Sequence, residues 1–241
     1  MDRRIKEISL KTSLSAIADL AMPRVCVVCG TPLIPQENHI CMNCLADMPL
    51  THFERMSHNP MADRFNSKIS ETGYCNAAAL YYYREDAGYK NISQALKYHR
   101  NFSAGEFFGS MLGERLATSA LFEDVDLVIP VPLHWTRKWK RGYNQAEIIA
   151  IAVSRTLGCT MDSRSLTKIR RTSSQTKLSG RDKDTNVASA FRCRPLTAGH
   201  ILLIDDVLTS GSTLAACHAA IRPACTASTR ISAATLAFVD D

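Results

Sequence analysis

Residues 201–214 read ILLIDDVLTSGSTL, an apolar run that ends in two aspartates and a loop of Thr, Ser and Gly. Four consecutive aliphatic residues are typical of a strand buried on both faces of a parallel sheet. In such sheets, ligands bind beyond the carboxyl ends of the strands. The stretch therefore predicts a strand that carries Asp205 and Asp206 to a binding edge, followed by a helix that begins near Ser212.

The loop Thr209–Thr213 has the composition of an anion site. Backbone N–H groups at the start of a helix, together with small hydroxyl side chains, suit a phosphate, and Gly211 lets the phosphate come close. Each hydrogen bond to a charged group contributes roughly 1.5–3 kcal/mol. The chain contains neither G-x-x-x-x-G-K-[ST] nor G-x-G-x-x-G, which excludes P-loop nucleotide hydrolases and dinucleotide-binding domains.

Two carboxylates beside an anion site would repel a simple phosphate. The ligand must therefore also bring hydrogen-bond donors or a cation for the carboxylates. Sugar hydroxyls or a divalent cation would each satisfy Asp205 and Asp206. A ribose 5-phosphate meets both demands, with its vicinal hydroxyls on the aspartates and its phosphate on the loop. The structural alternative is an aspartate that caps the strand–helix turn, but a cap needs one carboxylate and not two.

The remaining sequence repeats this alternation of buried strands and helices. Strands are predicted at residues 77–86, 126–132, 200–206 and 231–239, and helices at 89–100, 104–118, 143–158 and 212–222. Continuous apolar strands that alternate with helices indicate an α/β fold, with a mostly parallel sheet flanked by helices on both faces.

The N-terminal region contains two cysteine pairs, Cys26-x2-Cys29 and Cys41-x2-Cys44, separated by eleven residues. Four thiolates at this spacing suit one tetrahedral ion, and Gly30 supplies a turn after the first pair. Disulfides are disfavoured in a cytoplasmic chain, and four unrelated thiols rarely fall at this spacing. The pattern predicts a structural Zn²⁺ that stabilises the segment by about 10–16 kcal/mol and leaves no open position for catalysis.

Three regions are predicted along the chain. Residues 1–48 form an N-terminal amphipathic helix and the zinc-binding module, residues 49–73 a polar connector, and residues 74–241 the α/β domain. No stretch approaches the roughly 18 apolar residues of a membrane span. The apolar positions of residues 1–22 are interrupted, unlike those of a secretory leader, so we expect a cytoplasmic protein.

The positive charge is concentrated in one segment. Residues 134–194 carry fourteen basic and four acidic side chains, a net charge of +10, although the whole chain has a net charge of only +6. This concentration of charge favours a polyanionic ligand. A solvent-exposed basic surface without a ligand would explain about half of these basic side chains.

The stretch ILLIDDVLTSGST resembles the phosphoribosyl-pyrophosphate (PRPP) signature of type I phosphoribosyltransferases. Many members have Thr-Thr-Gly where this chain has Thr209-Ser210-Gly211, which retains a hydroxyl. With the four cysteines and the stretches VPVPLHWTRKWKRGYNQAEIIA and RRTSSQTKLSGRDKDTNVASAF, the chain resembles the ComF family over nearly its full length, apart from the first twenty or so residues. The resemblance implies a phosphoribosyltransferase-like domain at residues 74–241, PRPP and Mg²⁺ as ligands, and an association with DNA uptake in natural transformation.

The resemblance also implies roles for individual residues. The PRPP-binding set is Asp205, Asp206, Val207, Leu208, Thr209, Ser210, Gly211, Ser212 and Thr213. Arg137 and Arg141 match basic positions near the pyrophosphate, where guanidinium groups bind phosphate oxygens in pairs. Asn144 either caps the helix that begins near Gln145 or belongs to the site.

A long cationic stretch, RRTSSQTKLSGRDKDTN, has the composition of a mobile loop over an active site. Gln175 matches the family pattern there, and Lys177 or Arg181 would stabilise the departing pyrophosphate as catalytic residues alongside Asp205 and Asp206. An ordinary solvent-exposed loop is the alternative.

Two functions are consistent with these features. The first is a transferase that releases pyrophosphate from PRPP and joins the phosphoribosyl group to an acceptor. The second is a non-catalytic component that binds single-stranded DNA through the basic segment and through Trp135, Trp139 and Tyr143, with PRPP as a regulatory ligand. The resemblance implies single-stranded DNA and the helicase machinery of DNA uptake as partners.

Overall fold

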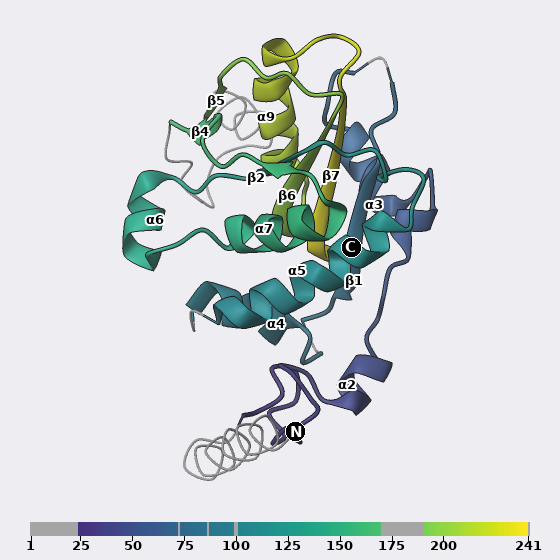
Figure 1. Ribbon diagram of the computed structural model, residues 1–241, viewed down its shortest axis with the longest axis vertical. Coiled ribbons are helices and arrows are strands. Elements are labelled where there is room, and N and C mark those ends of the chain that lie inside the picture. The colour runs from purple at the N-terminus through teal and green to yellow at the C-terminus, as the bar shows by residue number, and fades with distance from the viewer. Residues whose placement is uncertain (1–23, 72, 86, 99–100, 170–189, 241) are drawn as a thin grey trace, which may run out of the picture. The chain divides into compact units, whose positions relative to one another are not determined.

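The computed structural model describes residues 24–71, 73–85, 87–98, 101–169 and 190–240 (Figure 1). The chain divides into two compact units, Met1–Met48 and Pro49–Asp241. The helix predicted for residues 1–22 lies outside the described residues, and so do Gln175, Lys177 and Arg181.

The first unit is held by backbone hydrogen bonds around its two cysteine pairs. Val25 and Pro32 form an antiparallel bridge, and the Cys26 N–H donates to Thr31 O at 2.8 Å. The short helix α2 (Met42–Ala46) follows the third cysteine directly. The fold of this unit therefore places the first pair at a turn and the second pair at the start of α2.

The second unit is built on one five-stranded parallel sheet in the order β1-β7-β6-β2-β3. Its strands are β1 (Ala77–Tyr83), β2 (Leu127–Pro130), β3 (Thr160–Met161), β6 (His200–Leu208) and β7 (Arg230–Val239). A separate antiparallel hairpin consists of β4 (Leu166–Lys168) and β5 (Phe191–Cys193). The predicted α/β class with a mostly parallel sheet is confirmed.

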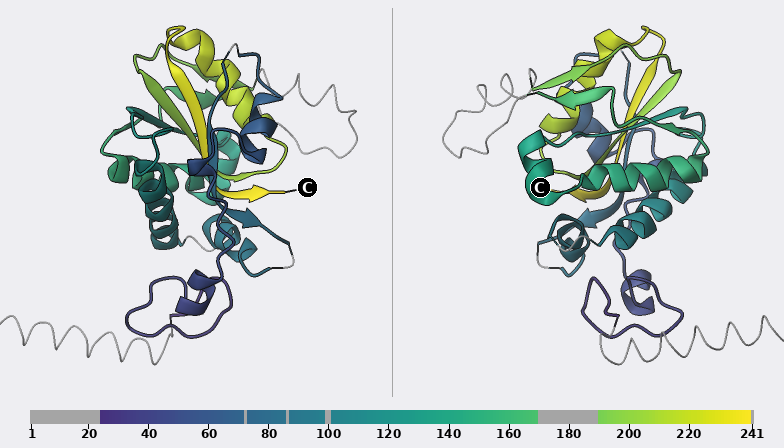
Figure 2. Two further views of the ribbon diagram at one scale, coloured as in Figure 1. Left: turned by 90° about the vertical axis from the view of Figure 1, so that its right-hand side faces the viewer. Right: turned by 60° about the vertical axis from the view of Figure 1, so that its left-hand side comes forward.

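Helices cover both faces of the sheet. They are α3 (Pro60–Asn66), α4 (Lys90–Tyr98), α5 (Phe102–Ala117), α6 (Trp135–Arg141), α7 (Gln145–Leu157) and α9 (Ser212–Ile221), with the short 3-10 turns η1 (Phe53–Arg55) and η2 (Arg222–Ala224). The pair α5 and α7 covers one face, and α3 and α9 cover the other (Figures 1 and 2). Within the described residues, no helix combines the length and apolarity needed to cross a membrane.

The helices α5 and α7 approach closely because three glycines of α5 face α7. A Cβ added at Gly105, Gly109 or Gly113 would come within 3 Å of a side-chain atom of the neighbouring structure. The same face carries fully buried Phe108 and Leu112. Small residues at every fourth position therefore set the distance between these two helices.

The stretch predicted as a connector, residues 49–73, packs as part of the second unit. Phe53, Met61 and Phe65 are fully buried, and Leu50 bridges to Tyr81 of β1. The side chain of Asn59 accepts a hydrogen bond from the Ala62 N–H and so caps α3. Residues 49–73 resemble a connector in the sequence because only a few of their side chains are apolar and buried, and the rest are polar.

The connections around β2 and β6 create a topological switch point. These two strands are neighbours, but the chain continues from β2 to β3 on one side and from β6 to β7 on the other. The connecting helices α7 and α9 consequently lie on opposite faces of the sheet (Figure 2). In open α/β sheets, ligands bind at the carboxyl ends of the strands at such a point.

Candidate functional site

A cavity of about 310 Å³ lies at the carboxyl ends of β2 and β6, at the switch point. It is lined by Lys97, Val131, Pro132, Leu133, Arg141, Asn144, Gln145, Lys168, Asp205, Asp206 and Thr213. The last residue of β2, Pro130, pairs with Ile204. Among the described residues, no strand pairs with β6 on that side beyond Ile204, and both aspartates of this part of β6 line the cavity.

The two aspartates form a strained electrostatic pair. The Asp206 N–H donates to Asp205 Oδ1 at 2.9 Å. Burial, followed by the negative charge of Asp206, raises the pKa of Asp205 well above its usual range. Lys97 Nζ lies 2.9 Å from Asp206 Oδ2, although this oxygen accepts no well-directed hydrogen bond within the described residues. One lysine therefore offsets part of the negative charge of this pair.

The loop after β6 has the backbone geometry of a tight strand–helix turn. Gly211 precedes α9 with φ of 77°, a left-handed conformation that side chains other than glycine rarely adopt. Ser210 Oγ donates to Ser212 Oγ at 3.2 Å, and Thr213 lines the cavity. The side chain of Leu208 is buried in the core, so only its backbone is available to a ligand.

The segment between α6 and α7 forms a second wall of the cavity. Arg141 lines it, whereas the side chain of Arg137 lies outside the described part of the chain. Asn144 occupies the cap position of α7 but makes no side-chain capping bond; its Nδ2 donates to Val131 O at 3.0 Å. Asn144 therefore ties α7 to the cavity wall, and the capping interpretation of its side chain is wrong.

Gln145 has a polar group that the described protein does not satisfy. The residue is 3% exposed, and its Nε2 has no hydrogen-bond partner within the described residues. A buried donor without an acceptor costs about 1–3 kcal/mol. Since Gln145 also lines the cavity, a ligand oxygen there would satisfy this donor.

Two charged cavity residues, Lys97 and Lys168, were not identified from the sequence. Gln145 stands in the GYNQ stretch, which matches the family pattern. Lys97 comes from the last turn of α4, and Lys168 ends β4, where its Nζ lies 4.9 Å from the Phe191 ring centre. Only the folded sheet brings these two lysines to the aspartates.

The four N-terminal cysteines come together as predicted. The Sγ atoms of Cys26, Cys29, Cys41 and Cys44 all lie within 4.8 Å of one another, and Cys29 Sγ is 3.8 Å from Cys41 Sγ. Thiolates around a tetrahedral zinc are also about 3.8 Å apart. No disulfide joins any of the nine cysteines, all of which lie in the described residues. The cluster fits a structural Zn²⁺.

The surroundings of the cluster favour thiolate ligands at one corner. Cys29 Sγ lies 3.2 Å from Thr31 Oγ1, and hydrogen bonding by Thr31 lowers the pKa of Cys29 to about 6. Gly30 has φ of 75°, which allows its N–H to turn back and donate to Cys26 O at 2.8 Å. Burial raises the pKa of Cys44, so an ion would have to displace its proton.

No family model matches the chain. DNA utilization protein YhgH of Salmonella typhi is 40% identical over 91 residues, which cover 37% of this chain and 40% of that protein. Competence protein F of Haemophilus influenzae is 36% identical over 93 residues, which cover 37% of this chain and 41% of that protein. The names of these relatives agree with the resemblance of this chain to the ComF family. The matched part spans about two fifths of the length of these relatives.

The YhgH protein of Escherichia coli (strain K12) is similar over a segment of the same length, with 41% identity over 91 residues. The similarity to phosphoribosyltransferases rests on a different observation, the signature at residues 201–213. The relatives therefore bear on the resemblance to the ComF family and not on the PRPP ligand.

Proposed function

We propose that this ComF-type chain binds PRPP and Mg²⁺ in the cavity at the switch point, and that it acts in DNA uptake. One observation carries the proposal: Asp205 and Asp206 share a cavity with Arg141, Lys97 and Lys168, beside the start of α9. A ligand that carries both hydroxyl donors and phosphates would use the acidic and the basic side chains together.

The ribose and its 5-phosphate would occupy the β6 side of the cavity. Asp205 and Asp206 would accept hydrogen bonds from the vicinal hydroxyls. The backbone N–H groups of Thr209–Thr213 would donate to the 5-phosphate at the start of α9, where the helix dipole adds a smaller attraction. The left-handed backbone at Gly211 supports this role because it allows the turn to close tightly.

The pyrophosphate would lie toward the wall formed by α6 and α7. Arg141 and Lys168 line that part of the cavity, and the Gln145 Nε2 donor lacks an acceptor within the described residues. The family resemblance adds Arg137 and Gln175 to this set. Guanidinium and ammonium groups neutralise phosphate oxygens, and the amide donor would fix their position.

The carboxylates fit the proposed Mg²⁺. This ion prefers oxygen ligands and binds through one or two carboxylates together with substrate phosphates. Burial and the charge of Asp206 raise the pKa of Asp205, and a bound cation would favour the ionised form of the pair. When bound, Mg²⁺ would neutralise charge on the pyrophosphate; Asp205 and Asp206 are the residues that would hold it.

The proposed reaction is phosphoribosyl transfer. The bond between C1 of the ribose and the pyrophosphate oxygen breaks, the electron pair leaves with the pyrophosphate, and a nucleophile of the acceptor forms the new bond to C1. The protein would align the two reactants and stabilise the developing charge. By the family resemblance, Lys177 and Arg181 would assist the leaving group.

Titration calorimetry with PRPP and Mg²⁺ tests the binding site. We expect Asp205→Asn and Asp206→Asn each to weaken PRPP binding by at least about tenfold, since each removes hydrogen bonds worth roughly 1.5–3 kcal/mol. Glu114→Gln, at an exposed position of α5, is the charge-matched control and should bind like the native chain. No PRPP binding by the native chain, or equal binding by the aspartate variants, would refute the proposed site.

A second function, single-stranded DNA binding, is favoured by helix α6. Its two tryptophans, Trp135 and Trp139, are 71% and 84% exposed and stand four residues apart, on one side of the helix. Exposed aromatic rings in a basic segment are a stacking surface for unpaired bases. Tyr143 is engaged elsewhere, because its hydroxyl donates to Leu96 O and its ring packs edge-on against Phe102.

The names of the relatives are consistent with this second function, since they concern DNA utilization and competence. We propose single-stranded DNA as the partner of α6, and the helicase machinery of DNA uptake as the surrounding assembly. PRPP would then be a regulatory ligand of a DNA-binding protein.

Fluorescence anisotropy with a labelled oligonucleotide tests the role of α6. We expect Trp135→Ala and Trp139→Ala each to weaken binding by about tenfold, since stacking contributes roughly 1–3 kcal/mol per base. Trp139→Phe should retain most of the affinity, and added salt should weaken binding by the native chain. Unchanged affinity in both alanine variants, or no binding at low salt, would count against DNA binding by α6.

A further inference from the structure

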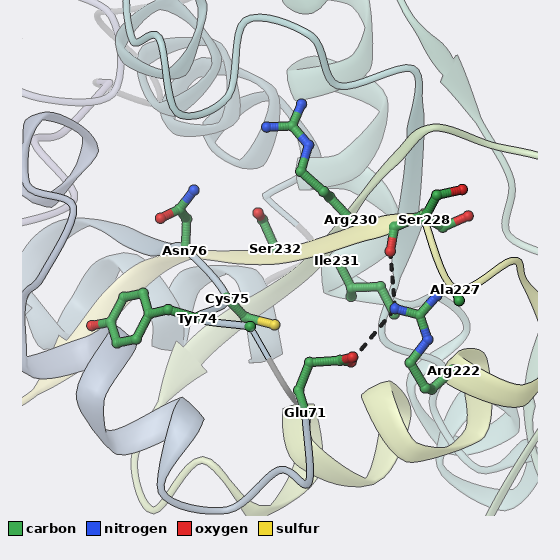
Figure 3. A pocket seen from close by; sticks show the side chains of 12 residues that line it. Glu71, Tyr74, Cys75, Asn76, Arg222, Ala227, Ser228, Arg230, Ile231 and Ser232 are labelled. Carbon is green, nitrogen blue, oxygen red and sulfur yellow. Dashed lines mark hydrogen bonds and ion pairs between the residues drawn. The ribbon is translucent and has the colours of Figure 1, made fainter.

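A second cavity, of about 180 Å³, lies at the amino-terminal ends of β1 and β7, the opposite edge of the sheet from the proposed PRPP site. Its lining includes Glu71, Cys75, Asn76, Arg222 and Arg230 (Figure 3). In Figure 3 the Glu71 carboxylate lies between the Cys75 thiol and the Arg222 guanidinium. Neither proposed function uses this cavity.

Three metal-binding side chains of different kinds meet beside this cavity. His218 Nε2 is 3.0 Å from Glu71 Oε2 and 3.9 Å from Cys75 Sγ. The oxygen, nitrogen and sulfur atoms all lie within 4.8 Å of one another. Around a tetrahedral zinc, such nitrogen–oxygen and nitrogen–sulfur pairs are separated by about 3.4 and about 3.6 Å, so small shifts would complete the geometry.

The surrounding structure holds each of these groups in place. The Asn66 side chain accepts from the Cys75 N–H at 2.9 Å and donates to Cys75 O at 2.8 Å, which fixes the backbone of the cysteine. The Phe65 ring packs edge-on against the His218 ring, with centroids 5.9 Å apart. Arg222 Nη1 lies 3.5 Å from Glu71 Oε2 and orients the carboxylate.

A metal ion at this place would need the neutral imidazole of His218 and the thiolate of Cys75, so it would displace the proton of the thiol when it binds. A hydrogen bond between His218 and Glu71 explains the 3.0 Å contact in the absence of metal, but it does not use the adjacent thiol.

We propose that Glu71, Cys75 and His218 form a second metal site, distinct from the four-cysteine cluster, which binds one divalent transition ion of the zinc type. One oxygen, one sulfur and one nitrogen ligand suit Zn²⁺ or Co²⁺ and exclude hard ions such as Mg²⁺. Three protein ligands leave a fourth tetrahedral position for water or a small ligand, an arrangement found in catalytic zinc sites. Two of the three ligands, Glu71 and Cys75, line the cavity.

Cobalt titration of the zinc-loaded full-length chain tests this proposal. One equivalent of Zn²⁺ is added first to fill the four-cysteine cluster and leave the second site empty, and Co²⁺ is then added while the sulfur-to-cobalt absorption in the near ultraviolet is followed. We expect one equivalent of Co²⁺ to bind with the absorption of a single thiolate ligand. We expect this absorption to disappear in Cys75→Ser and to persist in Cys193→Ser, the control at a half-buried cysteine of β5.

Two further measurements test the metal site without relying on Cys75→Ser, which could lose Co²⁺ binding simply by misfolding. Glu71→Gln preserves the size of a partly exposed side chain and should weaken Co²⁺ binding by at least tenfold while the sulfur absorption at saturation remains. Metal analysis of the native chain after Zn²⁺ loading and dialysis should give two ions per chain. A single ion per chain together with no Co²⁺ absorption would overturn the proposal, as would equal Co²⁺ binding by Cys75→Ser and the native chain.

Discussion

Asp205 makes the chain less stable at neutral pH when no ligand is bound. Its pKa is raised by burial and by the charge of Asp206, so the folded chain holds a proton that the unfolded chain releases above pH 4. The free energy of unfolding therefore decreases as the pH rises from about 4 toward the folded pKa. Such a residue is expected where function, and not stability, determines the side chain.

We expect Asp205→Asn to raise the melting temperature of the free chain at pH 7.5. The neutral amide avoids the cost of the buried charge, and even 1 kcal/mol corresponds to about 2–4 °C in a domain of this size. Thermal unfolding at pH 7.5 and near pH 4 measures the effect, which should vanish at the lower pH. With PRPP and Mg²⁺ present, the native chain should gain more stability than Asp205→Asn. A lower melting temperature for Asp205→Asn at pH 7.5 would contradict the assignment of a raised pKa.

At the scale of elements, the contact of α5 with α7 depends on glycine. A Cβ at Gly109 would lie 2.9 Å from Ala152 Cβ and 3.1 Å from Ile149 O. Because one of these atoms belongs to the α7 backbone, the helices would have to move apart. The close approach therefore explains why α5 contains a glycine that an isolated helix would disfavour.

We expect Gly109→Ala to lower the free energy of unfolding by about 1–2 kcal/mol. The steric cost of about 1–3 kcal/mol exceeds the gain of up to about 1 kcal/mol in helix propensity. Urea unfolding followed by circular dichroism measures the change. The neighbouring substitution Ser110→Ala, on the same helix at a half-buried position, should be neutral or slightly stabilising. A stabilised Gly109→Ala variant would show that the helices can separate without cost.

The long elements could be predicted from the sequence, and the short ones could not. Helix α7 is present and is followed by Gly158, and β6 carries the aspartate pair to the sheet edge. In contrast, β3 has two residues and α3 has seven, too few for a periodic pattern to stand out. For the same reason residues 49–73 suggest a connector in the sequence, although single side chains such as Phe53 are buried there.

At the scale of the whole molecule, sites formed by one short segment could be predicted from the sequence. Sites formed by residues from distant parts of the chain could not. The cysteine pairs and the stretch at residues 201–214 each lie within a short segment whose spacing indicates their chemistry. Lys97 and Lys168 join the cavity only through the packing of α4 and β4 around the sheet. The cluster of Glu71, Cys75 and His218 likewise joins residues almost 150 positions apart, with no spacing to reveal it.

The division into two compact units predicts that zinc binding and PRPP binding are separable. Cys41 is a buried member of the four-cysteine cluster. We expect Cys41→Ser to lose one zinc ion per chain. The apparent zinc-binding energy of roughly 10–16 kcal/mol that orders such a module would be lost with it. Residues 24–48 should then become sensitive to protease, because little else stabilises a unit of this size. The affinity for PRPP should change by less than about twofold, since every residue lining the cavity at the switch point belongs to the second unit.

Zinc analysis, limited proteolysis and calorimetry on the same preparation measure the three effects. The control is Cys159→Ser, which changes a half-buried cysteine outside the cluster. A loss of PRPP affinity in proportion to the loss of zinc would show that the first unit supports the site in the second.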